Sequence, residues 1–173
     1  ELSYNNIMDM DAASKLILEF DEPAVAIIKH NTPCGVAISD NLSEAYNKAF
    51  MTDSVSAFGG IIAFNRTVDK AIAETVHSLF TELLIAPEFT DEALEVLRKK
   101  RDRRLITANY DLLRQSLNFD LRAVSGGFLM QSTDTKLIDE AALRVVTKRQ
   151  PTDSEMKAMM FGWKVCKHVK SNA

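Results

Sequence analysis

The sequence of residues 24–35 is Ala24-Val25-Ala26-Ile27-Ile28-Lys29-His30-Asn31-Thr32-Pro33-Cys34-Gly35. Its first five residues form a continuous apolar run between Pro23 and the polar pair Lys29-His30, which predicts a short buried β-strand. Residues 31–35 have the composition of a turn. The segment therefore predicts an interior strand that ends in a lysine and a histidine.

The chain on both sides of this strand alternates between helical and strand patterns. Apolar residues at helical spacing predict a helix over 11–20, before the strand, and further helices over 41–51, 68–80 and 91–100. Short apolar runs predict strands at 61–64 and 83–86, and Arg104-Leu105-Ile106-Thr107 suggests a further strand. Asn41, followed by Glu44 three residues later, is a capping-box-like start for the second helix. This order favours a layered α/β domain with a largely parallel sheet.

The pattern changes from about residue 118. Residues 121–131 suggest two strands around the hinge Gly126-Gly127, and residues 145–147 suggest another short strand. Thr152 and Glu155 have the spacing of a capping box, which predicts a helix over the following residues. That helix carries a methionine-rich apolar stripe, which we interpret as core or as a subunit contact.

The composition is that of an ordinary globular domain. The chain has 173 residues, of which 46% are hydrophobic and 26% charged, enough for one domain or one large lobe of a bigger protein. The formal net charge of -3 argues against a protein whose main ligand is a nucleic acid. A basic run at residues 98–104 fits either a solvated helix end or a site for a polyanion or a nucleotide phosphate.

The cysteines and the first residues of the chain indicate the cellular compartment. Cys34 and Cys166 lie far apart and outside any paired spacing, so we expect no structural disulfide and a reduced, cytoplasmic compartment. No stretch approaches the roughly 18 consecutive apolar residues of a membrane span, and the first residues lack the pattern of a signal peptide. Because the chain begins at Glu1 without an initiator Met, we expect it to be part of a longer protein.

The pair Lys29-His30 is the best candidate for chemistry. Histidine changes protonation readily near neutral pH, and a neighbouring lysine can stabilise negative charge that develops on an oxygen. We place the pair at the carboxyl end of a strand, where open α/β sheets bind ligands. From spacing alone, two interpretations of the Lys29-His30 pair remain: an incidental pair and a catalytic pair. A nucleophilic Cys34 beside His30 is a further alternative. A deaminase zinc site is ruled out here, because the Glu of His-x-Glu and the second Cys of Pro-Cys-x-x-Cys are missing.

Two further features have competing interpretations. The segment Phe58-Gly59-Gly60 precedes a strand, unlike a dinucleotide-binding loop; it is either a tight turn with a core Phe, or a place where backbone approaches a ligand and Phe58 stacks on a planar ring. His77 and His168 lie on predicted helices without partners at metal-ligand spacing. We interpret both histidines as surface or structural residues.

Six segments, in order along the chain, resemble the family of AICAR transformylase/IMP cyclohydrolases, where AICAR is aminoimidazole carboxamide ribonucleotide. The resemblance covers essentially the whole chain. Its segments are residues 2–6, residues 28–37, residues 53–65, Ile85-Ala86-Pro87, residues 145–151 and residues 163–173, the last including Trp163-Lys164-Val165 and Val169-Lys170-Ser171-Asn172-Ala173.

The resemblance implies transfer of a formyl group from 10-formyltetrahydrofolate, the cosubstrate, to the 5-amino group of AICAR, without a metal. By the same resemblance His30 takes part in proton transfer at the amine and Lys29 supports it electrostatically at the formyl oxygen. Asn172 resembles the family residue that positions the formyl group. The positions that resemble contacts to the nucleotide or folate are Asn6, Phe58, Gly59 and Glu82.

The resemblance also implies an architecture. The family's transformylase domain resembles two cytidine-deaminase-like lobes, and its active sites form across a homodimer. We therefore expect a layered α/β/α lobe with a mixed, largely parallel sheet. Residues 1–173 match the first lobe, with an α/β core over about 1–117 and hinge strands and a helix over about 118–173. The cyclohydrolase domain and the second lobe are absent from this sequence, so we expect little or no turnover from the chain alone. A non-catalytic nucleotide-binding or dimer-forming module of the same fold is the alternative.

Overall fold

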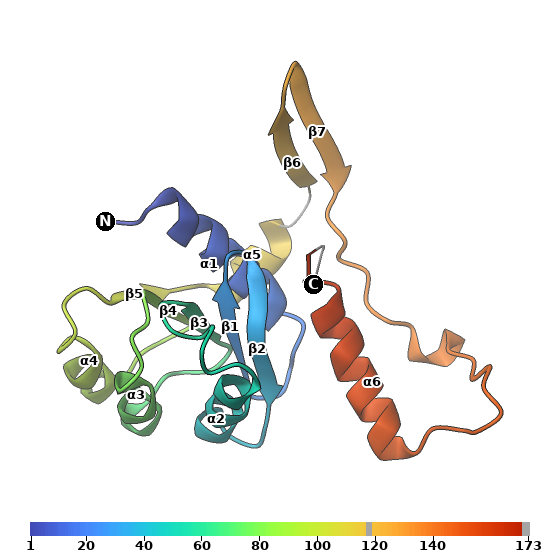
Figure 1. Ribbon diagram of the computed structural model, residues 1–173, viewed down its shortest axis with the longest axis horizontal. Coiled ribbons are helices and arrows are strands. Elements are labelled where there is room, and N and C mark those ends of the chain that lie inside the picture. The colour runs from blue at the N-terminus through green and yellow to red at the C-terminus, as the bar shows by residue number, and fades with distance from the viewer. Residues whose placement is uncertain (117–118, 171–173) are drawn as a thin grey trace. The chain divides into compact units, whose positions relative to one another are not determined.

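The computed structural model describes residues 1–116 and 119–170 (Figure 1). The chain divides into two compact units, which are treated separately below. The first consists of Glu1–Ala108 with Met160–Ala173, and the second of Asn109–Met159. The expected strand and helix patterns in residues 24–107 fall in the first unit.

The first unit contains a five-stranded sheet in the order β2-β1-β3-β4-β5. The strands are β1 (Ala24–Lys29), β2 (Thr32–Ile38), β3 (Ile61–Phe64), β4 (Leu83–Ala86) and β5 (Arg104–Thr107). Strand β1 is antiparallel to both β2 and β3, whereas β3, β4 and β5 are parallel to one another. Four strands therefore run in one direction and β1 runs against them. The expectation of a mixed, largely parallel sheet is confirmed.

Helices cover both faces of this sheet. The helices are α1 (Tyr4–Ile17), α2 (Leu42–Thr52), α3 (Lys70–His77) and α4 (Asp91–Leu97). Alternate strand side chains point to opposite faces. Those on one face form a single apolar cluster with α2, α3 and α4, and α1 lies against β1 and β3 on the other (Figure 1). The predicted α/β/α layering is confirmed, and burial from both sides explains why β1, β3 and β4 are continuous apolar runs.

The predicted turn at residues 31–35 is wrong. Strand β2 already begins at Thr32 and pairs with β1, so that only His30 and Asn31 form the turn. Both have positive φ, 53° and 61°, the backbone that a tight two-residue hairpin requires. Pro33 is accommodated because β2 is the edge strand of the sheet.

Helix α1 begins seven residues before the predicted start and ends three residues early. Ser3 caps it, because the Ser3 hydroxyl accepts from the Asn6 backbone N–H and the Asn6 side chain accepts from the Ser3 N–H, both at 3.1 Å. This capping box uses Asn at the third helical position, where the usual pattern has Glu or Gln. The predicted cap of α2 by Asn41 is confirmed, since its side chain accepts from Glu44 N–H at 2.9 Å.

The second unit contains a hairpin and little core. Strands β6 (Phe119–Val124) and β7 (Gly127–Ser132) pair around Gly126, whose φ is 86°, as the Gly-Gly pattern predicts. Helix α5 (Tyr110–Ser116) and the short η1 (Glu140–Ala142) were not predicted. The strand predicted at 145–147 is wrong, because this segment pairs with no other strand among the described residues.

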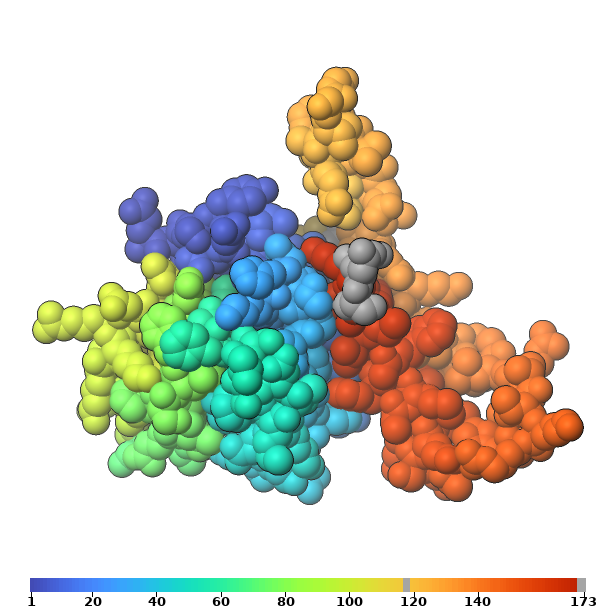
Figure 2. Space-filling view, viewed as in Figure 1, coloured from blue at the N-terminus to red at the C-terminus, as the bar shows by residue number. Residues whose placement is uncertain are grey.

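One face of the β6–β7 hairpin is apolar and exposed. The strand register places on this face Phe119, Leu121, Ala123, Phe128 and Met130. The four large side chains among them are between 61% and 70% exposed. The hairpin, drawn in yellow-orange in Figure 2, has only two strands. An isolated two-stranded hairpin is marginally stable in water. Its folding therefore depends on contacts beyond its own strands.

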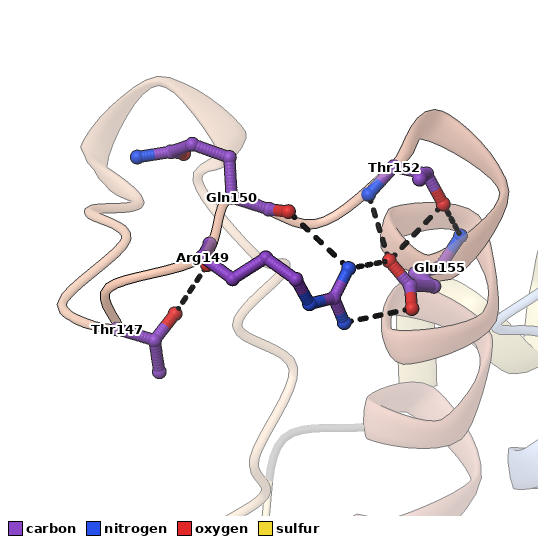
Figure 3. A network of polar contacts seen from close by, with 5 residues as sticks. All are labelled: Thr147, Arg149, Gln150, Thr152 and Glu155. Atoms are coloured by element: carbon purple, nitrogen blue, oxygen red, sulfur yellow. Dashed lines mark hydrogen bonds and ion pairs between the residues drawn. The ribbon is translucent and has the colours of Figure 1, made fainter.

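The predicted capping box at Thr152 is confirmed and extended by an arginine. The Glu155 carboxylate accepts from Thr152 N–H at 2.8 Å, and Thr152 Oγ1 accepts from Glu155 N–H at 3.2 Å (Figure 3). The Arg149 guanidinium makes two further bonds to that carboxylate, at 2.8 and 2.9 Å, and also donates to Gln150 O. Together these bonds, that from Arg149 foremost, lower the pKa of Glu155 to about 2. Helix α6 (Asp153–Cys166) starts from this network, next to the bond from the Thr147 hydroxyl to Arg149 O.

The end of α6 is fixed to the chain that follows α1, within the first unit. The Glu19 carboxylate lies 2.8 Å from Lys167 Nζ and 3.0 Å from His168 Nε2, and its side chain is only 12% exposed. The ring of Phe161 packs on Phe20, with centroids 5.4 Å apart. The interpretation of His168 as a surface or structural residue is therefore confirmed, but it lies just after α6 and not on the helix. The apolar stripe of α6 is not core in this chain, because Trp163 is 68% exposed.

Replacing Glu19 with glutamine is expected to loosen this attachment at neutral pH. Burial raises the pKa of Glu19, but bonds from His168 and Lys167 outweigh burial and hold it below the ordinary 4.5. The carboxylate therefore contributes stability above about pH 4.5, and this contribution is lost as the pH falls through the lowered pKa. We expect Glu19→Gln to cost about 2 kcal/mol at pH 7.

Urea unfolding of both proteins at pH 7 and at pH 3.5 measures this effect. The exposed pair of Lys15 and Asp11 on α1 supplies the control, Asp11→Asn, which is expected to change stability by less than about 0.5 kcal/mol. If Glu19→Gln lowers the free energy of unfolding by the same amount at both pH values, the ionised Glu19 carboxylate does not stabilise this attachment.

Candidate functional site

The predicted site residues that the structure describes gather at one edge of the sheet. Strand β1 ends there with Lys29, and β3, β4 and β5 begin there, since Ile28 pairs with Ile61, Ile61 with Leu83 and Leu83 with Arg104. The pair Lys29-His30 does lie at the carboxyl end of its own strand. Because β1 runs against its neighbours, however, this edge is the amino-terminal edge of the other strands. The analogy with ligand sites at the carboxyl edge of parallel sheets is therefore wrong.

Lys29 is held in place by the loop before β3. Its Nζ donates to the Phe58 carbonyl oxygen at 2.6 Å, and the residue is half-buried. A short bond from an ammonium group to a carbonyl is charge-assisted and restricts the long side chain to one position. The contact places a positive charge beside residues 58–60.

His30 is exposed and occupies the first position of the hairpin turn. The turn is tied to α1, since Asn31 N–H donates to the Asp9 carboxylate at 2.7 Å. The backbone under His30 is therefore fixed by β1, β2 and α1, while the imidazole remains accessible to a ligand. This combination suits a group that exchanges protons with a substrate.

Asn6 and Glu82, 76 positions apart in the sequence, are joined by a hydrogen bond. Asn6 Nδ2 donates to Glu82 Oε2 at 2.7 Å, and Asn6 is only 5% exposed. Glu82 is in turn fixed to the loop before β3, because its N–H donates to Gly60 O at 3.1 Å. The buried amide orients a half-buried carboxylate that keeps acceptor capacity for a ligand.

Phe58 and Gly59 form the third part of the site. Phe58 is 58% exposed, so the interpretation as a core phenylalanine is wrong. Its ring lies against Phe80, with centroids 5.2 Å apart. Gly59 has φ of 72° and donates its N–H to Phe80 O at 2.9 Å. Phe80 was not predicted as a site residue, because its apolar spacing placed it on a helix. The two rings offer an exposed aromatic surface for a planar ligand.

Cys34 does not behave as an activated nucleophile. Its thiol donates to Ile27 O at 3.5 Å, and burial, followed by the charge of Asp53, raises the pKa of the thiol above its ordinary value. A reactive cysteine needs a lowered pKa. Cys34 packs instead beside the apolar cluster under α2.

Asn172 lies outside the described residues. Within the described part of the chain, no group of three or more His, Cys, Asp or Glu side chains is arranged to hold a metal ion. In the same residues no helix is long and apolar enough to cross a membrane. Cys34 and Cys166 are both free thiols.

The fold and the site define a layered α/β protein that presents a cation, a carboxylate and an aromatic pair at one edge of a mixed sheet. The chain belongs to the AICARFT/IMPCHase bienzyme family, whose model matches residues 1–173. The family resemblance stated from the sequence is therefore confirmed.

Several curated relatives are similar over the whole chain. The bifunctional purine biosynthesis proteins PurH of Bacillus cereus (strain B4264) and Bacillus thuringiensis (strain Al Hakam) are each 51% identical over 173 residues. These matches cover 100% of this chain and 34% of each relative. The chain thus spans about a third of the length of the relatives it matches.

Two solved structures are also similar. RibD of Acinetobacter baumannii, form 1, has a TM-score of 0.45 at 14% identity, covering 62% of this chain and 36% of that one. The dCMP deaminase of the cyanophage S-TIM5 in apo form has a TM-score of 0.45 at 8% identity, covering 60% of this chain and 100% of that one.

Proposed function

We propose that this chain carries part of the active site for formyl transfer from 10-formyltetrahydrofolate to the 5-amino group of AICAR, in purine biosynthesis. The observation that carries the proposal is the gathering of Lys29, His30, the Asn6–Glu82 pair and Phe58 at one sheet edge. Membership of the bienzyme family supplies the reaction class. No metal is required in the proposed chemistry.

Each group has a role in the proposed reaction. The amine nitrogen of AICAR attacks the formyl carbon, and the bond from that carbon to the folate nitrogen breaks. His30 accepts the proton that the amine loses and returns it to the departing folate nitrogen. Lys29, with Asn172, stabilises the negative charge on the formyl oxygen.

The remaining site residues bind the nucleotide in this proposal. The planar aminoimidazole stacks near Phe58 and Phe80, and Glu82 accepts hydrogen bonds from the ligand. Gly59, with its positive φ, lets backbone approach the ring without a side chain in the way.

We further infer that residues 1–173 form the first deaminase-like lobe of a transformylase domain. The second lobe and the cyclohydrolase domain lie in the rest of a cytoplasmic, homodimeric full-length enzyme. The greater length of the relatives supports this inference.

The proposal is tested by incubating the full-length protein with AICAR and 10-formyltetrahydrofolate and following tetrahydrofolate release by absorbance. We expect turnover from the full-length protein and little or none from residues 1–173 alone. A folded full-length protein that binds AICAR by calorimetry but transfers no formyl group would favour a binding or assembly module.

Replacing Glu82 with glutamine is expected to weaken nucleotide binding more than catalysis. The change keeps the side-chain shape but removes the charge that accepts from the ligand. Hydrogen bonds to a charged group are worth about 1.5–3 kcal/mol, so the KM for AICAR should rise by roughly 10-fold or more. Steady-state kinetics with each substrate varied in turn provides the measurement. The exposed Glu95→Gln on α4 is the matched control, and an unchanged KM in Glu82→Gln would remove Glu82 from the site.

A further inference from the structure

The basic run at residues 98–104 is more than a solvated helix end. Arg103 is only 8% exposed, and its Nη2 donates to the Leu79 carbonyl oxygen at 2.7 Å. Lys100 Nζ donates to the same oxygen at 3.2 Å and to Ser78 O at 3.4 Å. Two cations from the connection between α4 and β5 thus donate hydrogen bonds to the segment that links α3 to β4.

These hydrogen bonds are made to the C-terminal end of a helix. Helix α3 ends at His77 with Ser78 as its cap, and carbonyls at a helix C-terminus carry partial negative charge and lack helical partners. Cations are favourable at such an end. The two cations therefore stabilise a turn that the helix itself leaves unsatisfied.

The burial of Arg103 is nevertheless costly. Within the described residues, its Nε and Nη1 are buried without a hydrogen-bond partner. Burial lowers the pKa of Arg103, and the interaction with Tyr46 offsets this lowering only in part. A buried guanidinium without a carboxylate partner is poorly compensated. Stability alone is thus a weak reason for an arginine here, where an apolar side chain would pack without that cost.

The held segment leads directly into the candidate site. Phe80, the next residue after Leu79, packs on Phe58 and accepts the Gly59 N–H at 2.9 Å. Glu82, three residues after Leu79, bonds to Asn6 and donates its N–H to Gly60 O. A shift of the Leu79 carbonyl would displace both the aromatic surface and the carboxylate.

We propose that Arg103 is a positioning residue: by holding the Leu79 carbonyl it fixes residues 80–82, and so sets the affinity of the site for its planar nucleotide ligand. The identity of the ligand rests on the proposed function, whereas the positioning does not. Arg103 touches no reacting atom in this proposal and acts only through Phe80 and Glu82.

The test compares Arg103→Met with Arg101→Met in the full-length protein. Both changes remove one positive charge from the same turn, but Arg101 is exposed. In Arg103→Met we expect the KM for AICAR to rise about 10-fold, the order expected for loss of a charge-assisted hydrogen bond, with kcat and the folate KM within about twofold. Arg103→Lys should recover part of the affinity, and Arg101→Met should match the wild type.

A second readout is independent of activity. Hydrogen exchange at the Gly59 and Glu82 amides, which bond to Phe80 O and Gly60 O, should speed up in Arg103→Met and not in Arg101→Met. Should Arg103→Met not fold, Lys100→Met removes a bond to the same carbonyl from a more exposed side chain and should show the same pattern, more weakly.

The results separate the two proposals. Wild-type protein that neither binds AICAR nor transfers formyl refutes the proposed function, while faster exchange in the variant still supports positioning. Unchanged exchange and unchanged nucleotide KM in folded Arg103→Met overturn the positioning role.

Discussion

Replacing His30 with alanine in the full-length protein is expected to reduce the kcat for formyl transfer by about 10²- to 10⁴-fold, the contribution typical of a positioned general acid–base. The imidazole lies on a fixed hairpin turn and is exposed, so its loss removes the proposed proton carrier without removing core packing. The KM for AICAR should change by less than about threefold, because Glu82 and the aromatic pair remain. Stopped-flow or steady-state assays of tetrahydrofolate release measure both constants.

The control for this prediction is His77→Ala, a histidine on α3 that the proposed chemistry does not use. It should retain near wild-type kcat. Circular dichroism and thermal unfolding must show that His30→Ala is folded. A folded His30→Ala protein that keeps more than about a tenth of the wild-type kcat would falsify the acid–base role.

Much of the first unit could be predicted because its strands are buried on both faces. The runs at 61–64 and 83–86 are short, continuous, apolar and fully buried, and each forms a strand at the predicted residues. The strand suggested at 104–107 also forms there, although it is only partly buried. Two helix N-caps could also be predicted from the sequence, since Asn41 and Thr152 each accept from a backbone N–H in the first turn of the helix that they cap. Such features are set by neighbours in the sequence and need no knowledge of the rest of the fold.

Features that depend on tertiary pairing were missed. Residues 31–35 have turn-forming composition, yet four of them join β2, because pairing with β1 outweighs local preference. The direction of β1 relative to β3 is likewise invisible in a pattern of apolar runs. It decides which edge of the sheet holds Lys29 and His30.

The site was predicted only in part by physical reasoning. The Lys29-His30 pair stands out for its chemistry, but Asn6 and Glu82 were singled out by family resemblance alone. Their hydrogen bond across 76 positions is a contact that no local pattern signals. Phe80 and Arg103 were missed for the same reason, since each acquires its role by touching residues far along the chain.

The hairpin that carries His30 depends on a glycine at its far side. Gly35 lies opposite Ile27 in the register of β2 and β1, and a Cβ at this position would meet the Ala49 backbone oxygen of α2 at 2.0 Å. Backbone at that distance cannot give way as a flexible side chain would. Strand β2 and helix α2 can therefore approach this closely only because residue 35 has no side chain.

Replacing Gly35 with alanine is expected to destabilise the first unit by about 3 kcal/mol, at the upper end of overpacking effects, because α2 must move away from the sheet. Native-state hydrogen exchange at the amides of β1 measures the loss as a lower free energy of opening. The matched control is Gly162→Ala on α6, where a Cβ meets nothing within 4 Å and alanine should stabilise the helix by about 0.5–1 kcal/mol. If the β1 amides of Gly35→Ala exchange no faster than those of the wild type, β2 and α2 cannot be packed as closely as described. If the variant opens readily and also loses turnover, the hairpin that presents His30 depends on the packing of β2 against α2.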